Sequence, residues 1–109
     1  MATTRKILGQ NVPSATLSEL IYTVPDATQV VVSSIICCNF SAVDDELSIA
    51  VVPSGGAVAT STLVYYRLPI SMSDTFTATV GITLNAGDMI YVYSQFGGVS
   101  FSIFGQEIT

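Results

Sequence analysis

The sequence predicts an all-β protein, a single-domain antiparallel β-sandwich of about eight strands, with a jelly roll as the leading topology. Three observations lead to this prediction. Apolar and polar residues alternate in short runs such as FTATVGI at 76–82 and VSFSIF at 99–104, so each run has one buried and one solvated face. Turn-forming residues recur about every eight to twelve residues. Val, Ile, Thr, Tyr and Phe dominate, and no window of comparable strength has apolar residues at helical spacing.

Length and composition fit one domain that covers residues 1–109. A domain of this size buries roughly 65% of the surface that its unfolded chain exposes, which is enough for one core. Half of the residues are apolar and 10% are charged, whereas an average soluble domain is about 25% charged. We therefore expect a surface rich in Ser and Thr, part of which other subunits cover.

The N-terminal part of the chain contains two expected strands. Residues 4–9 form the first, which ends before the turn residues NVPS, and residues 19–24 form the second, which ends at a Pro-Asp turn. The weak pattern at the start leaves an alternative open, in which residues 1–12 are an extended arm that reaches onto a neighbouring subunit. Trimming such an arm is expected to weaken attachment without unfolding the sandwich.

The next two expected strands, 29–40 and 46–52, lie on either side of a polar turn. In the segment ELSIAV, Leu47, Ile49 and Val51 occupy alternate positions and share one face. The sequence therefore predicts a β-hairpin between residues 29 and 52.

Four more strands complete the expected sandwich, at 61–68, 75–82, 89–94 and 98–106. The segments between them carry Pro, Gly, Asn and Asp, which are the residues that turns require. In the turn NAGD at 85–88, we expect Gly87 to supply a positive φ and Asp88 to cap the turn.

Two neighbouring cysteines, Cys37 and Cys38, lie within the third expected strand. Consecutive side chains on a strand point to opposite faces, so the two sulfurs cannot chelate one metal together. The chain has no His, which removes both the usual companion ligand of zinc and the usual base for a thiol nucleophile. We interpret both as reduced thiols that pack like small apolar residues.

The acidic triplet Asp44-Asp45-Glu46 is interpreted as a solvated turn. Calcium loops place oxygen ligands at alternating positions with a glycine at the sharp bend, and no glycine lies between Asn39 and Ser48. A weak site for a divalent cation is the alternative, and no resident metal is predicted.

Catalysis is not expected of this chain. Without His, and with Lys6 as the single lysine, a hydrolytic triad or dyad cannot be assembled in an ordinary form. Counting acids does not exclude the carboxylate pairs that cleave glycosides, but Trp is absent, so an aromatic-lined cleft beside them is not expected. We predict no enzymatic activity and no cofactor.

The charge balance bears on partners and location. The net charge is −5, and the only basic residues are Arg5, Lys6 and Arg67, whereas nucleic-acid binding requires clustered basic residues. No apolar run approaches the ~18 residues of a membrane span, and the segment that follows Lys6 is too polar for a signal peptide. We expect no nucleic-acid or membrane partner, and synthesis in the cytoplasm.

Tyrosines recur at alternate strand positions in Tyr65-Tyr66-Arg67 and in Tyr91-Val92-Tyr93. Three interpretations remain open for them. One tyrosine of each pair belongs to the core and the other to a sheet face, or the tyrosines contact another subunit, or they stack on a glycan. Tyr and Arg are enriched at protein interfaces because each combines a large contact area with a polar tip.

The order of several segments resembles that of short phage-encoded proteins found among virion structural genes, notably in tailed phages of cyanobacteria. The segments are KILGQNVPSAT, LIYTVPDATQVVVSSIICCNFS, ELSIAVVPSGGA, ITLNAGDMIYVYS and FSIFGQEIT, which together cover nearly the whole chain. The most specific element is YTVP at 22–25, followed by an apolar strand that ends at Asn39. These motifs are strand and turn features, and none of them carries a catalytic residue.

The resemblance implies a β-sandwich accessory protein of the phage particle. A capsid cement or decoration protein is the leading interpretation, and it implies contacts with the major capsid protein, a homotrimer and a place in the virion after synthesis in the host cytoplasm. A tail or fibre component that binds a host glycan or receptor is the alternative. We expect the contact residues to include Arg5, Lys6, Tyr65, Tyr66 and Arg67.

Overall fold

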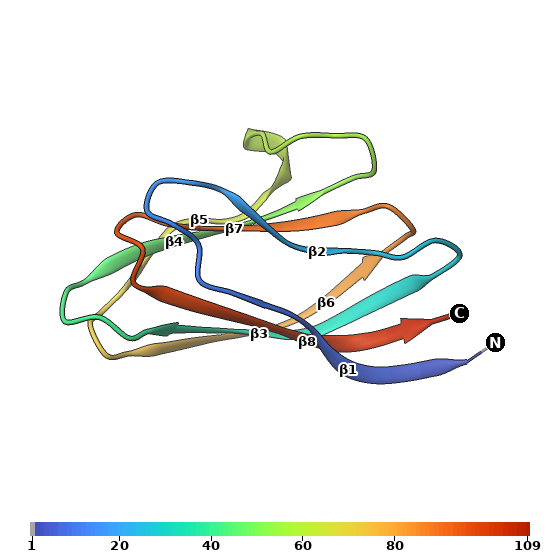
Figure 1. The fold of residues 1–109 in the computed structure, drawn as a ribbon, viewed down its shortest axis with the longest axis horizontal. Helices are drawn as coiled ribbons and strands as arrows, with labels where there is room; N and C mark the ends of the chain where they lie inside the picture. The colour runs from blue at the N-terminus through green and yellow to red at the C-terminus, as the bar shows by residue number, and fades with distance from the viewer. Residues whose placement is uncertain (1) are drawn as a thin grey trace.

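The structure is a computed structural model that describes residues 2–109. This part of the chain contains eight strands, with one turn of 3₁₀ helix between the fourth and the fifth. Figure 1 shows how they are arranged. The strands are β1 (Thr3–Asn11), β2 (Glu19–Thr23), β3 (Gln29–Asn39), β4 (Asp45–Val52), β5 (Leu63–Ile70), β6 (Thr75–Leu84), β7 (Met89–Ser94) and β8 (Val99–Ile108), and the short helix is η1 (Thr60–Thr62).

The strands form two four-stranded antiparallel sheets that pack face to face (Figure 1). The order is β1-β8-β3-β6 in one sheet, called sheet A here, and β2-β7-β4-β5 in the other, called sheet B. Each sheet therefore combines strands from both halves of the chain. Apart from β4 and β5, which are neighbours in sheet B, successive strands alternate between the sheets, as in a jelly roll. The predicted fold class is confirmed. The β-hairpin predicted between residues 29 and 52 is wrong, because the chain crosses between the sheets there: β3 pairs with β6 and β8 in sheet A, and β4 pairs with β5 and β7 in sheet B.

Every expected strand is present, and each end differs from its expected position by at most two residues. The agreement arises because the burial pattern follows the alternation in the sequence, as in β7, where half-buried and buried side chains alternate from Met89 to Ser94. Two turn details are also confirmed. Gly87 has φ of 86°, and the Asp88 carboxylate accepts hydrogen bonds from the backbone N–H groups of Asn85 and Ser54.

The N-terminal segment, for which the sequence left a strand and an arm both open, forms β1 at one edge of sheet A. Its partner is β8, from Thr3 opposite Ile108 to Asn11 opposite Phe101. One register shift lies between Ile7 and Gly9, and Leu8 at that shift points into the core. The N- and C-terminal segments are thereby joined within one sheet.

The core lies between the two sheets and is almost entirely aliphatic. Its largest fully buried side chains include Phe101, Ile35 and Ile103 from sheet A and Leu47, Ile49 and Ile90 from sheet B. Each side chain of this kind contributes about 1.5 to 3 kcal/mol through burial. Cys37 belongs to this core, whereas Cys38 is half-buried on the opposite face of β3. The prediction that these cysteines pack on opposite faces is confirmed.

The prediction that the acidic triplet 44–46 is a solvated turn is wrong for Asp45, which is buried with 2% of its surface exposed. Its carboxylate accepts four hydrogen bonds. The donors are the Ser94 hydroxyl and the backbone N–H groups of Glu46, Phe96 and Gly98, at 2.7 to 3.1 Å. Asp44 and Glu46 remain exposed and half-buried, respectively.

Asp45 is buried because the β7–β8 turn contains backbone N–H groups that have no hydrogen-bond partner in a neighbouring strand and need an acceptor. Asp45 supplies that acceptor from the start of β4, which lies beside β7 in sheet B. Burial alone would raise the pKa of the Asp45 carboxyl, but the hydrogen bonds outweigh burial and lower this pKa below its ordinary value. The sequence carries no signal of this contact because three of the four donors lie about fifty residues further along the chain.

Asn39 organises the same end of the sandwich. Its side chain is fully buried and donates to the backbone carbonyls of Val43 and Ile70 at 2.9 and 3.1 Å. Its carbonyl oxygen accepts from the backbone N–H and the hydroxyl of Ser41. Asn39 and Asp45 therefore hold three loops at this end in fixed positions.

Candidate interaction surfaces

The five predicted contact residues do not form one surface. Arg5 and Lys6 lie on β1, an edge strand of sheet A, whereas Tyr65, Tyr66 and Arg67 lie on β5, an edge strand of sheet B. The molecule therefore has two separate candidate surfaces, one on the outside of each sheet.

Lys6 is engaged within the chain. Its ammonium group lies 3.3 Å from Glu107 Oε1, and the Tyr22 hydroxyl donates a hydrogen bond to Glu107 Oε2. The hydrogen bond from Tyr22 lowers the pKa of Glu107 against the opposing effect of burial, with Lys6 adding to the lowering. Because Tyr22 lies in sheet B and Glu107 in sheet A, this contact joins the two sheets beside β1 and β2.

Tyr65 and Tyr66 point to opposite faces of β5. The Tyr65 ring packs edge-on against Phe76 of β6, with ring centroids 5.4 Å apart, and it adjoins the core. Tyr66 points outward with 67% of its surface exposed. Of the two residues, Tyr66 is the more exposed, and Tyr65 is half-buried.

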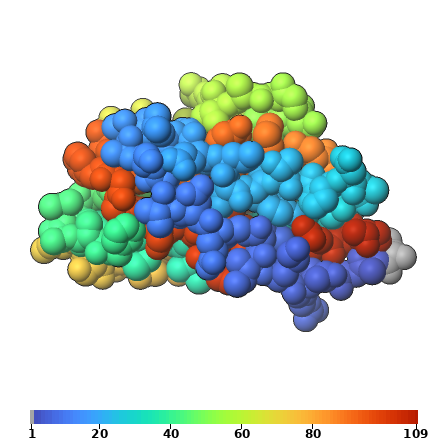
Figure 2. Space-filling model, in the orientation of Figure 1, coloured from blue at the N-terminus to red at the C-terminus, as the bar shows by residue number. Residues whose placement is uncertain are grey.

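The outer face of sheet B is partly covered by the β4–β5 loop, residues 53–62. Figure 2 shows this loop as the ridge in light green at the top of the molecule. Ala50 and Val52 of β4 are buried although they lie outside the main core. This sheet therefore does not offer a flat surface.

A groove of about 410 Å³ lies beside this loop, a volume within the usual range for small-ligand sites. Arg67 is fixed at its rim by two contacts. Its backbone N–H donates to the Ser48 hydroxyl at 2.9 Å, and its Nε donates to Glu46 Oε1 at 2.8 Å. The groove is lined by Ser18, Ser48, Val58, Ala59, Leu63, Tyr66, Arg67, Tyr93 and Gln95.

Two tyrosines from different strands line this groove. Tyr66 comes from β5 and Tyr93 from β7, and the Tyr93 hydroxyl donates to Gln95 Oε1 at 2.7 Å. The alternating tyrosines in the sequence indicated exposed rings on a strand. They did not indicate that β4 alone separates β5 from β7, and no sequence signal indicated Gln95 or the loop residues Val58 and Ala59.

The outer face of sheet A is different because it is broad and nearly free of charge. The register aligns its outward side chains in rows across the four strands, such as Ile7-Phe104-Ser34-Thr79 and Gln10-Ser102-Ile36-Thr77. Arg5, in the row with Gln106, Val31 and Thr83, is its one charged residue within residues 2–109. The rest is hydroxyl, amide, aliphatic and aromatic.

The acidic residues lie elsewhere. Seven of the eight are in loops or at the starts of strands of sheet B: Glu19, Asp26, Asp44, Asp45, Glu46, Asp74 and Asp88. The eighth, Glu107, lies opposite the core residue Val30 and so points to the inner side of sheet A. The net charge of −5 is therefore kept off the outer face of sheet A.

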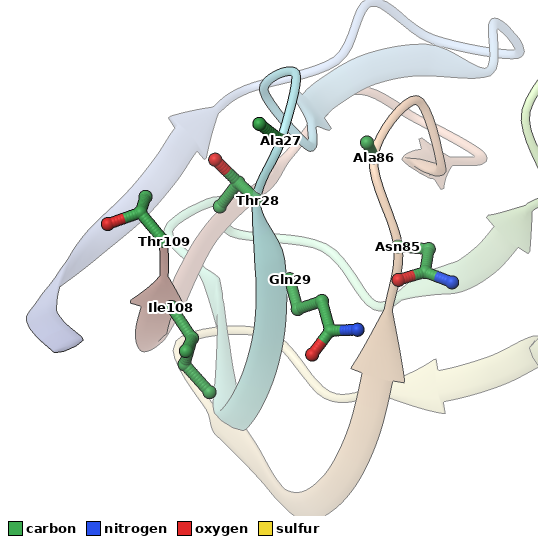
Figure 3. Close-up of a pocket in the computed structure, with 7 residues that line it drawn as sticks. All are labelled: Ala27, Thr28, Gln29, Asn85, Ala86, Ile108 and Thr109. Atoms are coloured by element: carbon green, nitrogen blue, oxygen red, sulfur yellow. The ribbon is translucent and has the colours of Figure 1, made fainter. Parts of the chain in front are cut away.

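A second hollow, of about 500 Å³, lies where several strands end (Figure 3). Its lining comes from the β2–β3 turn and the first residue of β3, the β6–β7 turn, and the C-terminal end of β8 with the residue after it: Ala27, Thr28, Gln29, Asn85, Ala86, Ile108 and Thr109. None of these side chains titrates or acts as a nucleophile activated by a neighbouring base, so this hollow has no catalytic constellation.

The described part of the chain offers no cluster of metal ligands. Within residues 2–109, no three His, Cys, Asp or Glu side chains lie close enough together to hold a metal ion. No helix in this range has the length and apolar character needed to cross a membrane.

Burial raises the pKa of the Cys37 thiol to about 12, which keeps it protonated and unreactive at neutral pH.

Comparisons with known proteins do not identify a function for the candidate surfaces. Neither a scan against protein-family models nor a search of curated proteins gives a match for this chain.

Proposed function

We propose that this chain is a non-enzymatic structural protein of a phage particle that decorates the capsid and stabilises it through contacts with the major capsid protein. The observation that carries this proposal is the low charge on the outer face of sheet A. Among residues 2–109, Arg5 is the one charged residue that the register places on this face. Charged residues are depleted at the centres of protein interfaces because their desolvation is costly. The segment order that resembles phage virion proteins supplies the particle as the setting.

The mechanism of such a protein is adhesion through a preformed surface. The two-sheet core fixes the outward side chains of sheet A before binding, so little conformational entropy is lost when they dock. Half-exposed Phe104 and Ile36 provide apolar area near the middle of the face, and Ser and Thr hydroxyls surround them. The chain would be made in the host cytoplasm and remain in the virion.

The test uses particles assembled without this chain, to which the purified protein is added. A double variant, Ser100→Lys with Ser102→Lys, places two charges on the outward face of β8. We expect binding to particles to weaken at least about tenfold, because buried charges are not compensated. The matched control is Ala57→Lys with Ser61→Lys on the exposed β4–β5 loop, which should bind as the wild type does. Equal binding by all three proteins, or no binding by the wild type, would refute the proposal.

A second candidate function is recognition of a host glycan by a tail or fibre component, and the groove on sheet B favours it. Tyr66 and Tyr93 supply aromatic surface, while Gln95, Ser48 and Arg67 supply hydrogen-bonding groups. This combination of a few aromatic faces with polar groups suits a sugar.

A panel of host-surface polysaccharides tests this candidate. We expect Tyr66→Ala to weaken binding by about tenfold or more, as loss of a central aromatic contact does, whereas Leu20→Ala, an exposed change outside the groove, should leave it intact. Absence of any bound polysaccharide in the panel would exclude the glycan function and leave the decoration test unaffected.

A further inference from the structure

Strand β6 (Thr75–Leu84) is the last strand of sheet A and pairs only with β3, so one side of it carries no strand. An edge of this kind presents a row of unpaired N–H and C=O groups and is a template for another strand. Proteins normally protect such edges with charges, proline, shortness or a bulge.

The other three edge strands have such protection. Strand β1 carries Arg5 and Lys6 and a register shift near Leu8. Strand β2 is five residues long and also shifts in register. Strand β5 contains Pro69, and Arg67 there has a left-handed φ of 51°.

Strand β6 has no charged residue and no proline, and it is not short. It is ten residues long with the sequence TFTATVGITL, and exposed positions alternate with half-buried or buried ones without interruption along it. Its register with β3 shifts between Val32 and Ser34, where Val80 and Gly81 of β6 lie opposite Ser33, so β6 has one extra residue at this point. The alternation of its side chains nevertheless continues through the shift. A long, uncharged run with high β-propensity and no proline aggregates readily when it is left uncovered.

The side chains of β6 suit another copy of the same strand. Its outward face presents threonines at 75, 77, 79 and 83, and cross-strand threonine pairs stabilise antiparallel sheets. Its inward face presents Phe76, Val80 and Ile82, which are only partly buried against the core. A second β6 would extend both rows and would bring no like charges together.

We propose that β6 pairs antiparallel with β6 of a second copy of this chain about a two-fold axis, so that two copies of sheet A become one eight-stranded sheet. An axis level with a residue keeps opposite side chains on the same face, whereas an axis midway between two residues exchanges the faces. An axis level with Thr79 or Val80, at the middle of the strand, pairs nearly all of β6. A two-fold contact is closed and leaves no further β6 edge for growth. This arrangement is a dimer, unlike the trimer that the resemblance implies.

The inference does not rest on the proposed function, because it concerns the purified chain alone. The first measurement is the mass of the full-length protein in solution by sedimentation equilibrium over a range of concentrations. We expect twice the mass of one chain. A double variant, Thr77→Lys with Thr79→Lys, introduces four like charges at the paired edges and should sediment as a monomer with an unchanged circular dichroism spectrum.

The matched control, Thr3→Lys with Gln10→Lys, places the same charges on β1 at the opposite edge of sheet A. It should remain a dimer, because β1 is not used. Hydrogen exchange gives an independent measurement. The β6 amides that point away from β3 should be protected in the wild type and should exchange rapidly in the Thr77→Lys, Thr79→Lys variant.

Three results would overturn the inference. The first is a monomeric wild type at every concentration. The second is a dimer that the lysines on β6 do not dissociate. The third is a trimer that either pair of lysines dissociates, which would indicate a ring in which β6 of one copy contacts β1 of the next. Binding to particles is a separate measurement, so either proposal can fail while the other holds.

Discussion

A single carboxylate, Asp45, fixes the β7–β8 turn by accepting the four hydrogen bonds described above. A buried charge is normally costly, and it is tolerated here because all of its strong acceptor positions are used. Hydrogen bonds to a charged group are individually worth about 1.5 to 3 kcal/mol. This side chain is therefore a main stabiliser of one end of the sandwich.

Asp45→Asn is predicted to reduce the free energy of unfolding by about 2 to 4 kcal/mol at neutral pH, because the amide nitrogen faces backbone donors and leaves them unsatisfied. Urea unfolding followed by circular dichroism measures this loss. Asp26→Asn, in an exposed loop, is the control and should change little. Unfolding curves for Asp45→Asn that superimpose on those of the wild type would contradict the assigned role.

The same variant has a defined pH dependence. The folded-state pKa of Asp45 is lowered, so its contribution is fully present above the unfolded-state pKa of about 3.9 and is lost as the pH falls through the folded-state pKa. The difference between wild type and Asp45→Asn should therefore be constant near neutrality and shrink below about pH 4. A difference that does not shrink would show that folding does not lower the pKa of Asp45.

At the scale of the element, β1 is structural rather than an appendage. It pairs with β8 from Phe101 to Ile108, contributes Leu8 to the core and provides Lys6 to the contact between the sheets. Gly105 on β8 allows β1 and β3 to approach closely, since a Cβ there would collide with the Val31 carbonyl oxygen and approach Leu8. The close fit of three strands depends on that glycine.

Removal of residues 2–11 is accordingly predicted to destabilise the fold, in contrast to the expectation for a free arm. Loss of Leu8 alone costs about 2 kcal/mol or more, and the edge of β8 becomes unpaired. We expect the thermal midpoint to fall by roughly 10 °C or more. Differential scanning calorimetry checks this, with removal of Ala2 alone as the control. An unchanged midpoint would mean that β1 behaves as an arm in solution.

At the scale of the whole molecule, charge and surface area are separated. The molecule measures 45 × 26 × 19 Å, and its acidic residues lie in loops, at the starts of sheet B strands or toward the inner side of sheet A. This separation leaves a wide outer face on sheet A with Arg5 as its charged residue and an uncharged edge on β6. The acidic residues therefore lie away from the outer face of sheet A, whose side chains are nearly uncharged.

The sequence indicated the fold more completely than the candidate surfaces. Alternation and turn residues are local, so the expected strands agree with the structure to within two residues at each end. The contact residues stay a prediction, and the structure places them in different surroundings. Tyr66 and Arg67 line a groove and Lys6 forms an ion pair within the chain, but Tyr65 is directed toward Phe76. Alternation shows that neighbouring tyrosines face opposite ways without showing which one faces the core.

The sequence by itself determined the class of fold, the positions of the strands and the placement of Cys37 and Cys38 on opposite faces, because these follow from the two-residue period of a strand. Only the tertiary structure decided which strands became edges, that Asp45 is buried, and that the acids leave the outer face of sheet A free. These features depend on contacts between residues far apart in the chain, such as Asp45 with Gly98 and Tyr22 with Glu107, and local periodicity carries no information about such pairs.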